Sequence, residues 1–108
     1  MPESVEEKST EKITVHVDAD IKDLISQFLE DWREEVKTMR EALEKGDYET
    51  IRMLGHNMKG TGGACGFDDV TDIGAHLEVA AKTKNNDVIQ KTLDDLTSYF
   101  ERIEVIYE

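Results

Sequence analysis

The chain has 108 residues and a formal net charge of −12 at pH 7, since 13 lysines and arginines stand against 25 aspartates and glutamates. This length suits one domain, and the acidic balance argues against nucleic acid or an anionic membrane surface as the main partner. The single cysteine excludes an internal disulfide, no apolar run approaches the ~18 residues of a membrane span, and the first residues lack the build of a signal peptide. We therefore expect a cytoplasmic protein.

Residues 1–12 are almost entirely polar, and we interpret them as a disordered acidic tail ahead of one domain over residues 13–108. The segment 13–17 alternates apolar and polar residues like a strand. No partner strand is evident elsewhere, so we expect an extended lead-in rather than a sheet. The initial Met1 and the polar tail favour a free-standing protein over a fragment of a larger one.

The first helical pattern covers residues 21–43, where apolar residues recur at steps of three and four. Asp18 or Asp20 can cap its start, and Gly46 can end it. No proline or glycine interrupts the pattern. It fits one long helix, and it also fits two helices broken near Ser26 and Gln27.

Three more helical patterns follow, in which apolar residues again recur at steps of three and four. The second starts at the cap Asp47 and runs to about Ala64, with Gly66 in a left-handed conformation after it. The third begins after a cap at Asp68 or Asp69, and the last runs from a cap at Asn86 through Tyr107. Short connections between such helices predict an all-α, antiparallel up-and-down bundle without appreciable sheet.

Five of the twelve residues in the segment 55–66 are glycines, although each interior glycine costs a helix about 1 kcal/mol relative to alanine. The helical phase nevertheless continues through them. One face collects the apolar and small residues Ile51, Leu54, Gly55, Met58, Gly62 and Cys65. We interpret Gly55 and Gly62 as close-packing positions and Cys65 as a small buried hydrophobe rather than a redox group.

The opposite face carries His56, Arg52 and Lys59, with Gly60 and Gly63 beside them. A neutral imidazole is a competent nucleophile near pH 7 without a helper base. Lys59 at i+3 and Arg52 at i−4 lie within reach of a group on His56 and would offset the charge of a transferred phosphoryl group. The glycines would leave the surrounding surface unobstructed.

Other site chemistries find no support in the pattern. His16 and His76 have no partners at metal-ligand spacing, so we expect no metal site. A carboxylate pair, a nucleophile–base pair and a glycine-rich phosphate loop are also missing, and these are the parts an independent phosphatase or hydrolase needs.

The string His56-x-x-Lys59-Gly60-x5-Gly66 resembles the signature of the histidine phosphotransfer (HPt) domain of two-component phosphorelays. The Gly46-Asp47-Tyr48 turn and the segments around residues 24–29 and 66–78 are similar to the family's flanking helices. The resemblance covers roughly residues 18–106. It implies a four-helix bundle with a short extra N-terminal helix, which favours a break of the first pattern near Ser26.

The resemblance also implies roles for three residues. His56 would be phosphorylated at Nε2, Lys59 would support the phosphoryl group, and Gly60 would prevent a steric block. Arg52 and Gly63 are added from the helical wheel alone, as phosphoryl-supporting or partner-facing positions. The family is a carrier without autokinase activity, and it needs no cofactor because Mg²⁺ would sit in the acidic pocket of the partner.

The implied partner is a response-regulator receiver domain, a hybrid sensor histidine kinase, or both, engaged by a monomer. The direction of transfer stays open. An alternative function is a non-catalytic interaction module, in which the bundle docks a signalling partner and His56 has no chemical role.

Overall fold

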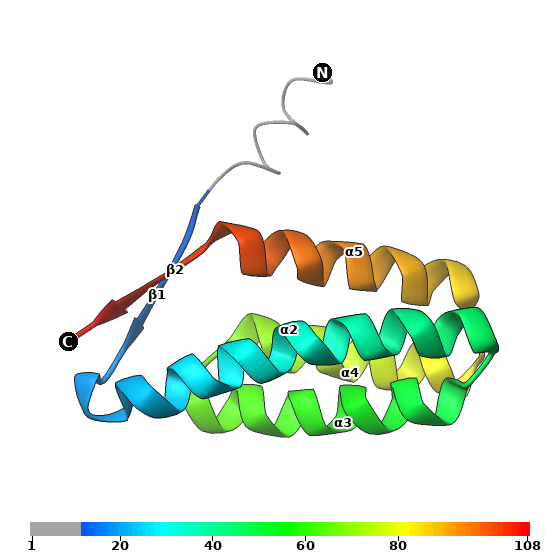
Figure 1. Ribbon diagram of the computed structural model, residues 1–108, viewed down its shortest axis with the longest axis horizontal. Coiled ribbons are helices and arrows are strands. Elements are labelled where there is room, and N and C mark those ends of the chain that lie inside the picture. The colour runs from blue at the N-terminus through cyan, green and yellow to red at the C-terminus, as the bar shows by residue number, and fades with distance from the viewer. Residues whose placement is uncertain (1–11) are drawn as a thin grey trace, which may run out of the picture.

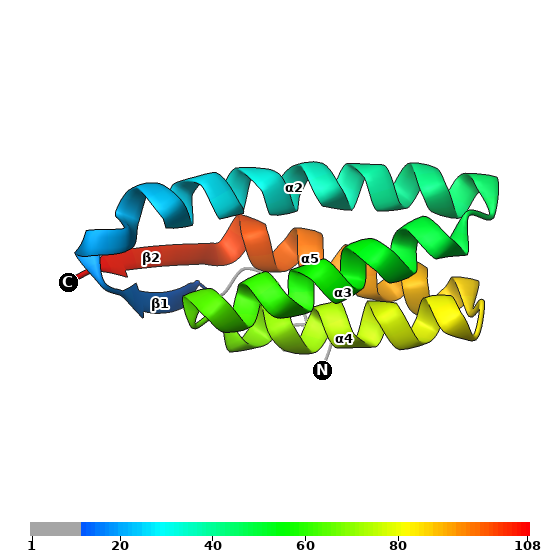
Figure 2. The ribbon, with the colours of Figure 1, turned by 90° about the horizontal axis from the view of Figure 1, so that it is seen from below.

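A computed structural model describes residues 12–108, so the predicted acidic tail lies outside the described residues apart from Lys12. Four helices run antiparallel (Figures 1 and 2): α2 (Lys22–Lys45), α3 (Tyr48–Cys65), α4 (Asp68–Lys82) and α5 (Asn86–Arg102). Helices α2 and α4 each contact both α3 and α5, which closes the arrangement. The predicted up-and-down bundle is therefore confirmed.

The first helical pattern forms one continuous helix, and the break expected near Ser26 is wrong. Helix α2 has 24 residues, and Ser26 and Gln27 lie on its exposed face, where nothing disturbs the apolar stripe. The short extra N-terminal element is instead one 3-10 turn at Ala19–Ile21. Asp18 caps this turn, because its carboxylate accepts a hydrogen bond from the Asp20 backbone N–H at 2.8 Å.

The ends of α2 and α3 follow the sequence signals. Gly46 and Gly66 adopt left-handed φ angles of 71° and 80°, so the two glycines end their helices as predicted. Asp47 caps α3 by accepting a hydrogen bond from the Thr50 backbone N–H at 3.2 Å.

Two predicted caps are wrong. Helix α4 has no side-chain cap, since Asp68 and Asp69 already lie in its first turn and the preceding Phe67 buries its ring in the core. The cap of α5 is Asn85, one residue before the predicted Asn86, and its side chain accepts a hydrogen bond from the Val88 backbone N–H at 3.2 Å.

The expectation that the segment 13–17 is an extended lead-in without a partner strand is wrong, although the strands are a minor part of the helical fold. Strand β1 (Ile13–Val17) pairs in parallel with β2 (Ile103–Tyr107), with Ile13 opposite Ile103 and Val17 opposite Tyr107. The predicted last helix therefore ends at Arg102, and the chain continues past the end of α5 as a strand (Figure 1). The whole bundle serves as the crossover that a parallel pair requires. The pair is stabilised because its inward-facing residues pack against the helical core.

Trp32 of α2 lies at the centre of the aromatic core. Its ring stacks on Phe28 and Phe100 with centroids 5.7 and 6.0 Å apart, and meets the edge of Phe67 at 5.4 Å. The indole N–H donates a hydrogen bond to the Thr61 hydroxyl of α3 at 2.9 Å. This bond satisfies the one polar group that the buried ring carries.

Helices α3 and α4 approach each other closely through glycines. A Cβ atom at Gly55 would lie 2.9 Å from the Gly74 carbonyl oxygen, and one at Gly62 would lie 2.9 Å from the Thr71 backbone nitrogen. From the other side, a Cβ atom at Gly74 would lie 2.6 Å from the Lys59 backbone nitrogen. The close-packing interpretation of Gly55 and Gly62 is confirmed, and Gly74 completes the contact.

Within residues 12–108, no helix has the length and apolar character needed to cross a membrane.

Candidate functional site

His56 lies on the solvent-facing side of α3, near the middle of the helix. Its side chain is 60% exposed, so a partner can reach the ring. Lys59 follows one turn later on the same side and is less exposed. The described geometry therefore brings together two of the residues that the sequence singles out.

Helix α4 contributes a third residue, Glu78, which contacts both. Its Oε2 atom lies 3.2 Å from His56 Nδ1, and its Oε1 atom lies 3.4 Å from Lys59 Nζ. The Glu78 side chain is only 13% exposed, so the carboxylate is held between the two helices. The carboxylate is the bridge that couples the imidazole to the ammonium group.

An ionised Glu78 favours one tautomer of His56. Burial on its own would raise the pKa of Glu78, but the hydrogen bond from Lys59 and the charges of Lys59, His56 and Lys82 outweigh burial and lower it. An ionised carboxylate can only accept a hydrogen bond, so Nδ1 carries the proton in this contact. The lone pair of a neutral ring is then on Nε2, outside this contact.

Arg52 is engaged elsewhere than at His56. Its guanidinium forms an ion pair with Glu49, three residues earlier on the same helix. The hydrogen bond with Glu49 and the charge of Glu49 raise the pKa of Arg52, and the charge of Glu78 adds to this effect. In the described part of the chain no hydrogen bond or ion pair joins Arg52 to His56. Its role in supporting a phosphoryl group stays a prediction.

The glycines beside His56 leave open surface. A Cβ atom at Gly60 would have no neighbour within 4 Å, and one at Gly63 would meet only the Thr71 hydroxyl at an ordinary 3.6 Å. Packing against α4 therefore does not require glycine at these two positions. Because they have no side chains, they leave a low surface next to the imidazole, with no atoms that project toward solvent.

A hollow of about 460 Å³ adjoins His56 between α2 and α3. It is lined from α2 by Phe28, Asp31, Trp32 and Glu35, and from α3 by His56, Asn57, Gly60 and Thr61. Burial, together with the nearby charge of Asp31, raises the pKa of Glu35. This side of the site is therefore acidic and partly apolar, in contrast to the cationic Lys59 side.

Residues 12–108 contain no group of three or more histidine, cysteine, aspartate or glutamate side chains that can hold a metal ion. Cys65 is buried, as predicted for a small core residue, and burial raises the pKa of its thiol. A raised pKa disfavours the thiolate that redox or nucleophilic chemistry needs.

Sequence reasoning missed the site roles of Glu78 and Gly74. Both lie on α4, and a helical wheel drawn for α3 says nothing about which residue of a neighbouring helix faces His56. The available signal was the glycine at position 74, which stands on the buried face of α4 four residues before Glu78. A small residue there allows the close approach that brings the carboxylate to the imidazole.

The family model of the Hpt domain matches residues 23–105 of the chain. No curated protein and no solved structure gives a significant match.

Proposed function

The chain belongs to the Hpt domain family, whose members carry phosphoryl groups in phosphorelays, and from this premise we propose that His56 is the carrier residue. The Nε2 lone pair attacks the phosphorus of an aspartyl phosphate in a receiver domain. The new N–P bond forms as the bond between phosphorus and the aspartate oxygen breaks, and the aspartate leaves as a carboxylate. Donation to a receiver is the same step in reverse.

The observation that carries this proposal is the double contact of Glu78 with His56 and Lys59. When Nε2 is phosphorylated and Nδ1 keeps its proton, the ring bears a positive charge. The carboxylate next to Nδ1 stabilises that charge and orients the ring before the reaction. A bundle that only docks a partner does not require this arrangement.

Lys59 and Gly60 serve the phosphoryl group itself. The Lys59 ammonium, held by Glu78 one turn from His56, offsets the charge on the phosphoryl oxygens. Gly60 leaves space for those oxygens, since nothing lies within 4 Å of its missing Cβ atom. Arg52 and Gly63 are proposed as secondary positions, Arg52 for charge and Gly63 for clearance of the receiver.

The proposed partner is the receiver domain of a response regulator or a hybrid sensor histidine kinase. Its own acidic pocket supplies the Mg²⁺ for the reaction, and the chain itself works as a cytoplasmic monomer without autokinase activity. The low surface at Gly60 and Gly63 and the exposure of His56 support approach of such a domain to near-attack distance.

The test is intact-mass spectrometry after mixing with a phosphorylated receiver. We expect a gain of about 80 Da that is acid-labile and is lost in His56→Gln. His76→Gln, which changes another exposed histidine, is the matched control and should label like the parent. Labelling of His56→Gln at the parent level would refute the assignment, and failure of the parent to label with any receiver would favour the interaction-module alternative.

Two further variants separate the roles around His56. Lys59→Ala and Glu78→Gln should each slow transfer by about three- to tenfold without abolishing it, because both contacts are long and partly exposed to solvent. Nitrogen NMR of the ring provides a second measurement, since Glu78→Gln should also loosen the preference for the Nδ1–H tautomer. An unchanged rate together with an unchanged tautomer would show that Glu78 does not position His56.

A further inference from the structure

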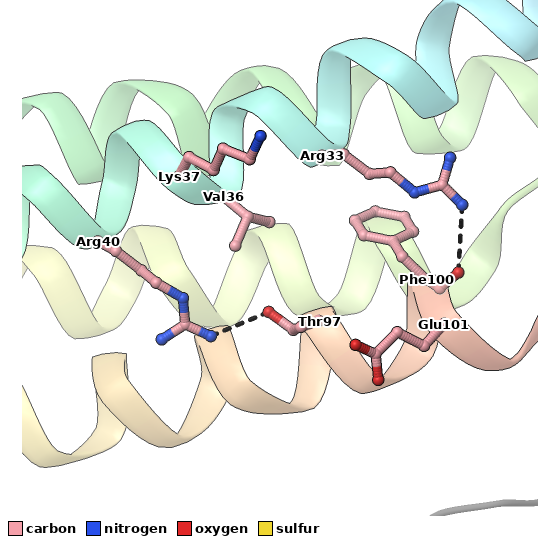
Figure 3. A pocket seen from close by; sticks show the side chains of 7 residues that line it. All are labelled: Arg33, Val36, Lys37, Arg40, Thr97, Phe100 and Glu101. Carbon is pink, nitrogen blue, oxygen red and sulfur yellow. Dashed lines mark hydrogen bonds between the residues drawn. The ribbon is translucent and has the colours of Figure 1, made fainter.

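A second cleft, of about 270 Å³, lies between α2 and α5 and shares no lining residue with the hollow beside His56. Figure 3 shows the side chains that line it. It is lined by Arg33, Val36, Lys37 and Arg40 of α2 and by Thr97, Phe100 and Glu101 of α5. None of these residues lines the hollow beside His56. A partner in this cleft would therefore leave the phosphotransfer surface free.

The cleft combines an apolar floor with a cationic rim. Val36 and Phe100 are buried residues whose side chains form the floor. Three cations and one carboxylate line the cleft, although the whole chain has almost twice as many acidic as basic residues. Counting Glu34 and Asp94, which pair with Lys37 and Arg40, the positive and negative charges around the cleft balance, in contrast to the acidic molecule as a whole.

Arg33 is the cation with the most free binding capacity. Its guanidinium donates a hydrogen bond to the Phe100 backbone carbonyl at 3.2 Å and lies 5.9 Å from the centre of the Phe100 ring (Figure 3). Among residues 12–108 no carboxylate forms an ion pair with it. By contrast, Arg40 pairs with Asp94 at 3.0 Å and Lys37 with Glu34 at 3.3 Å. The guanidinium of Arg33 is therefore held in place, while most of its N–H donors remain available for a carboxylate.

The shape of the cleft indicates an elongated occupant. Residues 33, 37 and 40 lie along one side of α2 and span about 10 Å of helix axis. A compact anion would engage one of these cations, whereas a peptide segment can engage the row and place an apolar side chain on the floor. The volume lies just below the usual range of about 300–1,000 Å³ for small-molecule sites.

We propose that the α2/α5 cleft docks a segment of a partner protein in which carboxylates flank an apolar side chain, with Arg33 as its main anchor. The net charge of −12 repels such a segment at long range, so affinity comes from short-range contacts. Binding should therefore depend only weakly on salt, unlike binding of a nucleic acid, whose affinity falls steeply as salt increases. The proposal does not depend on the phosphotransfer role of His56.

The experiment titrates the full chain into a fluorescein-labelled octapeptide in which aspartates and glutamates flank one phenylalanine. The control peptide replaces every carboxylate by its amide. We expect the acidic peptide to bind at least fivefold more tightly than the amide peptide. Arg33→Gln should remove most of this difference, and Arg33→Lys should remove part of it, because lysine keeps the charge but not the fork. Lys91→Gln, an exposed lysine on α5 outside the cleft, should bind like the parent.

Backbone NMR shifts locate the peptide. We expect them around Thr97 and Phe100 and not around His56, with an unchanged rate of phosphotransfer in the peptide-bound protein. The proposal would be overturned if the parent bound the two peptides with equal affinity, or if Arg33→Gln bound the acidic peptide as tightly as the parent does. Shifts centred on His56 would also overturn it. Binding of duplex DNA or of phosphatidylserine vesicles in place of the peptide, lost in Arg33→Gln, would also overturn it, since it would assign the cleft to another class of partner.

Discussion

Adding one methyl group at Gly55 should destabilise the fold and disturb the site at the same time. A Cβ atom there would lie 2.9 Å from the Gly74 carbonyl oxygen, 3.0 Å from the Glu78 backbone nitrogen and 3.1 Å from Leu77 Cβ. Two of these neighbours are backbone atoms, so α3 and α4 must separate. Overpacking of this kind costs about 1–3 kcal/mol, and the better helix propensity of alanine returns about 1 kcal/mol.

The matched control is Gly60→Ala, five residues further along α3. A Cβ atom at Gly60 would meet nothing within 4 Å, so only the propensity gain of about 1 kcal/mol applies. Gly55→Ala should therefore be less stable than Gly60→Ala by about 1–3 kcal/mol. For a domain of this size, that corresponds to a difference in Tm of roughly 4–20 °C.

Thermal unfolding followed by circular dichroism measures the first effect, and transfer from a phosphorylated receiver measures the second. We expect Gly55→Ala to melt lower than the parent and to transfer more slowly, because the displaced backbone belongs to Glu78. If Gly55→Ala melts as high as Gly60→Ala, the α3–α4 contact is not as close as described. If it melts lower yet transfers at the parent rate, the position of Glu78 does not govern transfer.

Three other changes test separate features. Gly63→Leu should melt no lower than the parent, because its Cβ atom has ordinary contact with Thr71, yet it should block transfer by obstructing the receiver; transfer at the parent rate would show that Gly63 does not face the partner. Glu35→Gln should raise stability at pH 7 by about 0.5 kcal/mol, because it removes a carboxylate whose charge is disfavoured by burial and by Asp31. This gain should shrink as pH falls below about 4, where the glutamate is largely protonated in both the folded and the unfolded state. Burial raises the pKa of Tyr99 to about 12, whereas an unfolded tyrosine ionises near 10. The unfolding free energy should therefore fall as pH rises from about 10 to 12, and unfolding curves of Tyr99→Phe at alkaline pH should show a smaller fall.

The buried face of α3 could be predicted because helical phase alone determines it. Ile51, Gly55, Met58, Gly62 and Cys65 are the buried residues of this helix, and all five stand on the predicted core face. Periodicity survives glycine substitution, since the backbone keeps its 100° turn per residue whatever the side chain. The exposure of His56 follows from the same phase.

The strand pair could not be predicted, because parallel pairing joins the two ends of the described chain. The segment 103–107 continues the three–four spacing of α5, and it is also a short run in which only Glu104 is charged, so its pattern fits both a helix and a strand. The β-branched residues Ile103, Val105 and Ile106 favour the strand. What decides the structure is contact with β1, about 90 residues away in sequence, and a local pattern does not contain that information.

The site at His56 depends on packing as much as on its own side chains. Four glycines in α3 cost that helix about 1 kcal/mol each, and they divide into two classes. Gly60 and Gly63 face open surface, which the proposed function assigns to a partner, whereas Gly55 and Gly62 let α4 approach. Without that approach, Glu78 would not reach His56, and the imidazole would have neither a fixed tautomer nor a counter-charge. If His56 carries the phosphoryl group as proposed, the requirements of that chemistry also constrain Gly55 and Gly62, which lie on the opposite face of α3.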